Sequence, residues 1–175
     1  MITSGHGVNQ FTTPKPNLGA SYELSYLLGV LKGDACIYET RHKKHYEHII
    51  QLAVIDKEFA EYFVEVLEKI FCRRVSIINY RDDRDRLFYK VIIRSKEFYE
   101  WYKSKTAEEL YKIAEPFSNA FIKGIFDSEG NLCYFKTKYR DKIYLSPVVR
   151  LCSSDKNLIE VVQKWSNTYY NILGK

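Results

Sequence analysis

The sequence predicts an α/β chain, of the α+β kind, built from two pseudo-symmetric αββαββα-like halves with antiparallel sheets, the second half being abbreviated. Three observations support this prediction. Two apolar segments nearly repeat each other along the chain. Residues of alternating polarity, typical of strands, follow each of these segments. Junctions between a strand and a helix recur at a similar interval, which indicates an internal repeat.

The two apolar segments, 27–34 and 122–129, each carry small residues four positions apart and finish on an acid. These residues are Gly29, Gly33 and Asp34 in the first segment, and Gly124, Ser128 and Glu129 in the second. Glycine within a helix costs about 1 kcal/mol relative to alanine, so we expect a compensating close approach of two helices. If the segments pack together, the two acids lie side by side, and neighbouring carboxylates repel unless a cation lies between them.

Between and after these segments, the pattern predicts alternating hairpins and helices. Helix starts are indicated by polar residues that can cap a helix, namely Ser21, Asp56 and Ser95, and a further short helix is expected over 106–114. The amphipathic stretch 57–71 shows an apolar stripe of helical period. The strands expected from alternation are 36–41, 47–54, 74–80, 87–94, 133–140 and 142–152.

The junctions 55–59, 94–98 and 154–158 share a capping residue, a lysine, a polar residue and a large apolar residue. The first and third are 99 positions apart, and the two terminal acids of the apolar segments are 95 apart. We therefore expect a first half over 21–117 and an abbreviated second half over 118–175. Residues 1–20, rich in Gly, Ser, Thr, Asn and Pro, are expected to form a flexible arm, because no signal-peptide hydrophobic region is present.

Composition limits the class of protein. The 175 residues carry a net charge of +5, which suits a polyanionic partner without requiring one. No apolar stretch reaches the roughly 20 residues of a membrane helix. The scattered cysteines, Cys36, Cys72, Cys133 and Cys152, are expected to be reduced, mostly core residues of an intracellular protein. A zinc site at His42, His45 and His48 is not expected, because a hairpin would direct these side chains to different faces.

The paired segments resemble the signature helices of the LAGLIDADG homing endonucleases, in the single-chain form with two motifs, as found in archaeal introns. Gly29 and Gly124 match the first glycine of the motif, and Asp34 and Glu129 match its last acid. Lys32 replaces the first acid of the motif, which Asp127 keeps. Ala35 replaces the closing glycine, which Gly130 retains.

The resemblance implies catalytic, metal-binding roles for Asp34 and Glu129, with the backbone carbonyls of Gly33 and Ser128 facing the metal. It implies a site-specific, Mg²⁺-dependent endonuclease that makes a double-strand break with a short 3′ overhang, Mn²⁺ or Ca²⁺ being able to substitute in binding. The expected partner is double-stranded DNA with a long asymmetric target, bound by a monomer in the cytoplasm at the nucleoid. The alternatives are an intron-splicing maturase and a non-cleaving DNA-binding protein of the same fold. A scaffold protein that binds no nucleic acid is a third class.

The antiparallel sheets are the expected DNA-binding surfaces, since a basic ribbon can lie in the major groove. In the second half, the even-numbered residues of both strands are expected on one cationic face, with Ile143, Leu145, Val149 and Leu151 facing the helices. The alternative is an ordinary half-solvated sheet. The residues expected to contact DNA are Arg41, Lys43, Lys44, Gln51, Arg74, Arg84, Lys90, Arg94, Lys136, Lys138, Arg140, Lys142, Tyr144 and Arg150.

Further residues near the acids cannot be assigned uniquely. The resemblance implies a glutamine near the end of the second strand, but Val54 and Ser153 stand at the matching strand ends, and Gln51 lies three positions early. Lys103, Lys105 and Lys136 remain open as electrostatic helpers.

Overall fold

The structure is a computed structural model that describes residues 14–42 and 45–170. Lys43 and Lys44, residues 1–13 of the expected arm and residues 171–175 lie outside the described residues. The helices and strands follow one another as α1 (Tyr22–Val30), β1 (Cys36–His42), β2 (His45–Val54), α2 (Lys57–Phe71), β3 (Ile77–Arg81), β4 (Leu87–Arg94), α3 (Lys96–Lys103), α4 (Ala107–Ala114), η1 (Glu115–Phe117), α5 (Ser118–Glu129), β5 (Gly130–Tyr139), β6 (Lys142–Leu151) and α6 (Lys156–Tyr170).

This order confirms the predicted mixed fold with antiparallel sheets. The helix caps predicted at Ser21, Asp56 and Ser95 are formed, each side chain accepting a hydrogen bond from a backbone N–H in the first turn, and Thr106 caps α4 in the same way. Helices α1 and α5 form the centre of the molecule, where every residue of α1 from Leu24 to Val30 is buried. A helix that is apolar on all sides needs neighbours on all sides.

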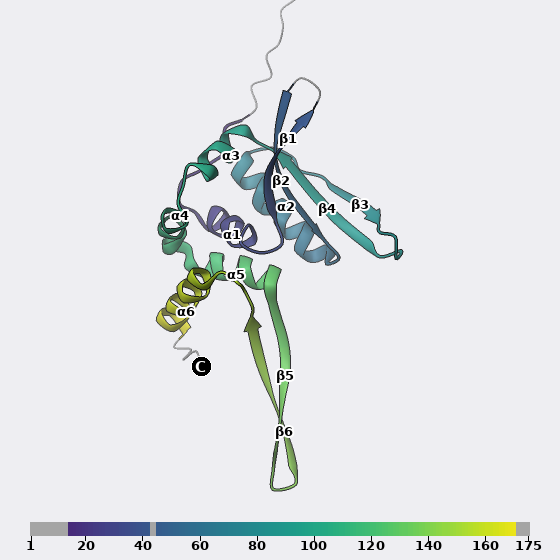
Figure 1. The fold of residues 1–175 in the computed structure, drawn as a ribbon, viewed down its shortest axis with the longest axis vertical. Coiled ribbons are helices and arrows are strands. Elements are labelled where there is room, and N and C mark those ends of the chain that lie inside the picture. Colours follow the sequence, from purple (N-terminus) through teal and green to yellow (C-terminus); the bar gives the residue numbers. More distant parts are fainter. Residues whose placement is uncertain (1–13, 43–44, 171–175) are drawn as a thin grey trace, which may run out of the picture.

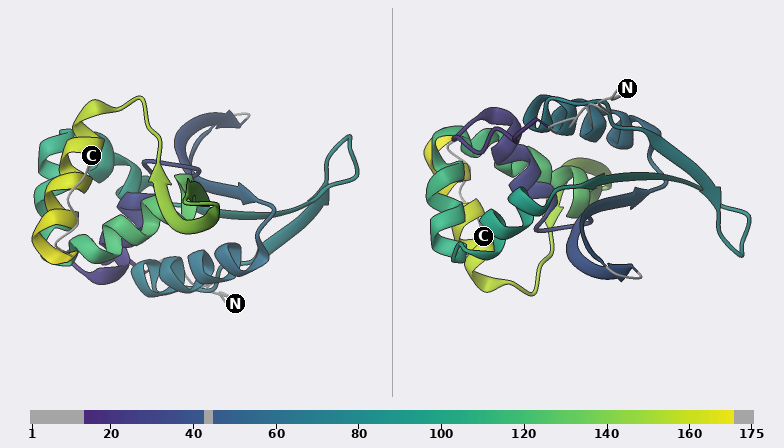
Figure 2. Two further views of the ribbon diagram at one scale, coloured as in Figure 1. Left: turned by 90° about the horizontal axis from the view of Figure 1, so that it is seen from below. Right: turned by 90° about the horizontal axis from the view of Figure 1, so that it is seen from above.

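The first sheet has four antiparallel strands in the order β1-β2-β4-β3. Its inner face, formed by residues such as Ile50, Leu52 and Val91, is buried against α2. The predicted stripe of α2 is buried in the same core. Figure 1 shows α2 behind this sheet, and Figure 2 shows the β3–β4 hairpin projecting on the side opposite to α4, α5 and α6.

Residues 14–20 belong to the expected arm, and part of them contacts α2. The N–H of Asn17 donates to the carbonyl of Ile70 at 2.7 Å, and Leu18 packs against the core. Strand β3 begins at Ile77, three residues later than expected. Cys72 ends α2 with a left-handed backbone (φ 51°), and the N–H of Val75 is bound by Glu68, so the chain is not free to pair earlier.

The second sheet consists of β5 and β6, which extend away from the helices as a long two-stranded arm (Figure 1). The prediction that Ile143, Leu145 and Val149 face the helices is wrong, because these side chains are 57–63% exposed. Leu151, at the base of the arm, does pack against the core. The alternating polarity of β6 therefore predicted the strand correctly, but it did not predict whether the apolar side chains are buried.

The predicted grouping of basic residues on the arm is also wrong. Gly130 lies opposite Leu151, and Tyr139 lies opposite Lys142. Opposed residues share a face, so even-numbered residues of β5 lie with odd-numbered residues of β6. Lys136 and Lys138 thus share a face with the apolar side chains of β6, whereas Lys142, Tyr144 and Arg150 lie on the opposite face.

The four cysteines are free, as predicted, but the prediction that most are core residues is wrong. Cys36, Cys72 and Cys152 are exposed and Cys133 is half-buried. Cys36 is the first residue of β1, Cys72 follows α2, Cys133 lies in β5 and Cys152 follows β6. Within residues 14–42 and 45–170, no helix is both long and apolar enough to cross a bilayer.

Candidate metal and nucleic-acid site

The contact between α1 and α5 is a contact of backbone against backbone. A Cβ atom added to Gly29 would lie 2.3 Å from the carbonyl oxygen of Phe121, and one added to Gly124 would lie 2.4 Å from the carbonyl oxygen of Tyr26. Neither distance leaves room for a methyl group. The close approach predicted from the repeated glycines is therefore confirmed.

The helices stay in contact up to their terminal acids. A Cβ on Gly33 would lie 2.4 Å from the Cβ of Ser128 and 3.0 Å from the Cγ of Glu129. Helix α1 itself ends at Val30, and residues 31–34 continue as a tight turn, with the N–H of Gly33 donating to the carbonyl of Val30. This turn directs Asp34 toward the same end of the pair as Glu129.

The two predicted metal ligands are neighbours with charges of the same sign. Both Asp34 and Glu129 have exposed side chains. Partial burial by the surrounding protein, followed by the charge of Glu129, raises the pKa of Asp34. A raised pKa means that the ionised form of Asp34 is disfavoured here, and a bound cation would remove this penalty.

A cavity of about 320 Å³ opens beside Asp34. It lies between the end of β2, the start of α2 and the start of β4, and its lining includes Val54, Asp56 and Arg86 together with Asp127. The cavity therefore combines several carboxylates with one guanidinium group. A negatively charged phosphate and a cation could both be accommodated in such a mixed environment.

Arg86 was missed as a site residue by the sequence analysis. Its guanidinium contacts Asp82 at 2.6 Å and lies 5.4 Å from the centre of the Phe88 ring. These two contacts hold the side chain at the cavity. Its sequence position, in a charged turn, shows only that it is exposed. Its proximity to Asp34 depends on the long-range pairing of β4 with β2.

Asp127 has a structural environment distinct from that of Asp34. The hydroxyl of Tyr26 donates to Asp127 at 2.7 Å, and Lys123 forms an ion pair with the same carboxylate. Lys123 also lies 4.2 Å from the centre of the Tyr62 ring. Burial, followed by the hydrogen bond to Asp127, raises the pKa of the Tyr26 hydroxyl, which therefore stays protonated as a donor.

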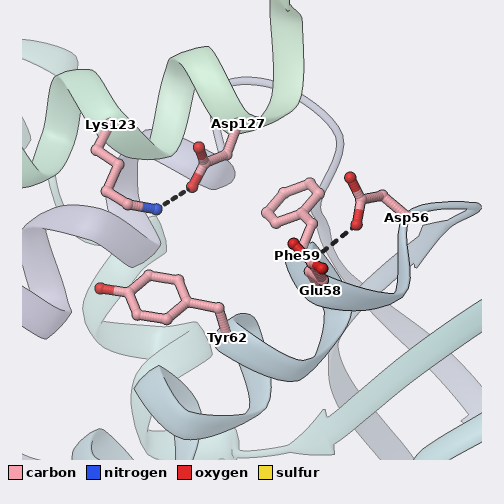
Figure 3. Close-up of a pocket in the computed structure, with 6 residues that line it drawn as sticks. All are labelled: Asp56, Glu58, Phe59, Tyr62, Lys123 and Asp127. Atoms are coloured by element: carbon pink, nitrogen blue, oxygen red, sulfur yellow. Dashed lines mark hydrogen bonds and ion pairs between the residues drawn. The ribbon is translucent and has the colours of Figure 1, made fainter.

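Lys123, Asp127 and Tyr62 line a second cavity of about 360 Å³, and Figure 3 shows Lys123 reaching toward Asp127 above the ring of Tyr62. Because its carboxylate already has two partners, Asp127 serves to fix α5 rather than to hold a metal ion. The corresponding residue of the first segment is Lys32, in the turn after α1, and its Nζ lies 3.8 Å from the carboxylate of Asp155, the residue before α6. In both repeats the residue at this position therefore forms a contact with another helix or its cap: Asp127 with Tyr26 of α1, and Lys32 with Asp155.

The first sheet leaves one face free of α2. Residues that lie opposite each other on neighbouring strands share a face. Gln51 lies opposite Ile92 and Arg94 lies opposite Ile49, so Gln51, Lys90 and Arg94 are all on the open face. Gln51 accepts a hydrogen bond from the Tyr38 hydroxyl at 3.1 Å. Arg94 lies 2.9 Å from Glu47.

The other predicted DNA-binding residues of the first half lie at the rims of this sheet. Arg41 is at the end of β1, Arg74 precedes β3, and Arg84 lies in the turn between β3 and β4. All three side chains are exposed. The open face therefore carries few charges, and most of the basic residues surround it.

In the second half, the predicted residues divide between two faces of the arm and its turn. Lys142, Tyr144 and Arg150 form one face, and Lys136 and Lys138 lie on the other. Arg140 stands in the two-residue turn, with φ of 45°. Among the lysines that remained open as helpers, Lys105 pairs with Glu109, and Lys103 lies over the ring of Tyr99. The basic residue that lines the same cavity as Asp34 is Arg86.

Comparisons with known proteins agree with this architecture. No family model matches the chain. An uncharacterized protein of Methanocaldococcus jannaschii (MJ0314) is 33% identical over 154 residues, which cover 85% of this chain and 55% of that protein. The chain spans about half the length of the curated relatives it matches.

Solved structures share the fold. The crystal structure of I-DmoI in complex with DNA and Mn matches with a TM-score of 0.61 and 20% identity, covering 87% of this chain and 80% of that one. The N-terminal LAGLIDADG domain of WhiA matches with a TM-score of 0.50 and 17% identity, covering 87% of this chain and 68% of that one. The chain therefore has the LAGLIDADG fold seen in structures of homing endonucleases.

Proposed function

We propose that this chain is a single-chain, two-motif LAGLIDADG endonuclease that cuts double-stranded DNA with a divalent metal ion, Mg²⁺ being the expected ion. The main support is the pairing of Asp34 with Glu129 at the end of two helices in backbone contact. The fold shared with homing endonucleases supports the same proposal. The two halves are assigned to residues 21–117 and 118–175, with α1 and α5 at their interface.

The residues at this end fit a hard divalent cation. Each helix supplies one carboxylate, and the pKa of Asp34 is raised in part by the charge of Glu129. Mg²⁺ prefers oxygen ligands and keeps several waters, so it needs few protein carboxylates. Asp34 and Glu129 would hold the metal, with the backbone carbonyls of Gly33 and Ser128 as further oxygen donors.

A bound divalent cation would activate a water molecule and neutralise charge on the phosphate during hydrolysis. The chain's own residues supply the rest. Arg86, which lines the same cavity as Asp34, would bind a phosphate oxygen, because a guanidinium matches phosphate geometry. Asp127 and Tyr26 keep α5 in place. Two acids related by the pseudo-twofold axis can serve the two strands of a duplex, which accounts for a double-strand break.

The open face of the first sheet and the face of the arm with Lys142, Tyr144 and Arg150 are proposed to contact the DNA grooves. The two surfaces differ in size, since one belongs to four strands and the other to two. An asymmetric target site is expected for this reason. Phosphate contacts from the surrounding basic residues would set the position of the duplex.

A cleavage assay with a randomised duplex library, with and without Mg²⁺, tests the proposal. We expect Mg²⁺-dependent cutting by the native chain, and loss of cutting with retained DNA binding in Asp34→Asn and Glu129→Gln. Glu108→Gln, which changes an exposed acid on α4, is the matched control. Full cutting by both site variants would contradict the proposal. Salt-dependent binding without cutting by the native chain would assign it to the maturases or non-cleaving binders instead.

A further inference from the structure

One face of the β5–β6 arm carries large apolar side chains, with Lys136 and Lys138 among them toward the turn, and has no cover in the described structure. We call it the apolar arm face. Its large side chains are all 57–66% exposed, and they are Leu132, Tyr134, Ile143, Leu145 and Val149. A contiguous apolar patch of this kind marks an interaction site more often than a scattered set of exposed residues does.

The internal repeat shows what this face corresponds to. In β2, the residues alternating back from the end of the strand are Val54, Leu52 and Ile50, which are 9%, 0% and 1% exposed. In β6, the residues alternating back from the end of the strand are Leu151, Val149 and Pro147, and Leu145 and Ile143 continue the same face outward. Leu151 itself packs on the core. Val149 and Pro147 thus stand in the positions of Leu52 and Ile50, which are buried in the first half, and Leu145 and Ile143 extend the same face outward.

The helix that follows β6 does not serve as this cover. Trp165 of α6 packs edge-on against Phe121, with the ring centres 5.3 Å apart, and against Tyr111, with the ring centres 6.5 Å apart. Leu158 and Val162 of the same helix are also buried. The apolar side of α6 is therefore used by α4 and α5. Figure 1 shows the arm extending beyond α6.

The charges and the backbone of the arm restrict what can bind. Residues 130–151 contain five basic residues and one acid, Asp141, and Lys136 and Lys138 lie on the apolar arm face itself. A partner with acidic borders around an apolar centre fits this distribution. Proline in a sheet is confined to edge strands and similar positions, so Pro147 disfavours addition of another strand beside β6 and favours a partner that lies across the face.

We propose that the apolar arm face is a docking surface for an amphipathic helix of another protein, with glutamates along the borders of its apolar stripe. Helix α2 shows the matching chemistry at the equivalent place in the first half, with a buried stripe and Glu58, Glu61, Glu65 and Glu68 beside it. Binding here leaves the opposite face of the arm, with Lys142 and Arg150, free.

A synthetic peptide with the sequence of residues 56–71, carrying a fluorophore, serves as the probe for the full chain. We expect saturable binding by fluorescence anisotropy, weakened about tenfold in Leu145→Ser because apolar contact area is lost. Phe135→Ser is the matched control, since Phe135 is 56% exposed on the opposite face. Lys136→Glu and added salt should also weaken binding, without removing an apolar side chain.

Circular dichroism of each variant verifies that it is folded. Absence of saturable binding would overturn the proposal, as would equal binding by Leu145→Ser and Phe135→Ser, which would place the peptide elsewhere. A dimer of the chain in sedimentation that dissociates in Leu145→Ser would assign the surface to a second copy and would also overturn it.

Discussion

Replacing Gly29 with alanine tests the backbone contact on which the site depends. The added Cβ would lie 2.3 Å from the Phe121 oxygen, 3.1 Å from the Phe121 carbonyl carbon and 3.2 Å from the Gly124 Cα. All three atoms belong to the backbone, so no side-chain rotation can relieve the contact. Because real Cβ atoms essentially never lie under 3.0 Å from such an atom, the helices must separate by at least about 0.7 Å.

The expected loss of stability follows from two opposing terms. Overpacking a well-packed core costs about 1–3 kcal/mol, here at the upper end. Alanine regains about 1 kcal/mol of helix propensity relative to glycine. We therefore expect Gly29→Ala to reduce the free energy of unfolding by about 2 kcal/mol, which lowers the Tm of a chain of this length by about 4–8 °C.

Thermal unfolding followed by circular dichroism measures this change, with urea unfolding as a second measurement. Asn119→Ala, at an exposed position of α5, is the control that gains helix propensity without a new contact. A Tm for Gly29→Ala equal to or above that of the native chain would refute the reasoning. It would mean that α1 and α5 are not in contact at their glycines.

Three further outcomes are expected. Arg86→Ala should lower the cleavage rate more than the affinity for DNA, as single-turnover and binding assays would show; an equal loss in both would make Arg86 a simple binding residue. The pKa of Glu23 is lowered first by hydrogen bonding to the backbone, and also by Lys69, so its contribution to stability is present above its unfolded-state pKa and is lost on acidification. Glu23→Gln should therefore flatten the acid side of a Tm-against-pH curve, and an unchanged slope would contradict this. Asp141→Gly should slow hydrogen exchange in β5–β6, equivalent to about 0.5–1 kcal/mol, because Asp141 has φ of 60° in the turn; faster exchange would show that its ion pair with Lys138 matters more.

The sequence was informative where the signal is local. The glycine spacing predicted the contact of α1 with α5, because the missing side chains are visible in the sequence itself. The caps at Asp56 and Ser95 predicted helix starts to the residue, since a capping side chain bonds only to its own first turn. Alternation found the strands of both sheets.

Long-range information was missing where the predictions failed. The faces of β5 and β6 depend on the two-residue turn at Arg140 and Asp141, which sets the register, and a shift by one residue exchanges the faces. Burial of Leu145 depends on whether another segment covers it, which alternation does not report. The place of Arg86 beside Asp34 depends on the pairing of strands about forty residues apart.

The glycine contact between α1 and α5 also limits how such proteins can be recombined. Most interfaces between half-domains consist of side chains, whose rotamers can adapt to a new neighbour. Here the meeting surfaces are peptide groups, and these have no such freedom. A chimera that joins the first half to the second half of another protein should keep the two acids aligned only if that second half also has a glycine at the position of Gly124.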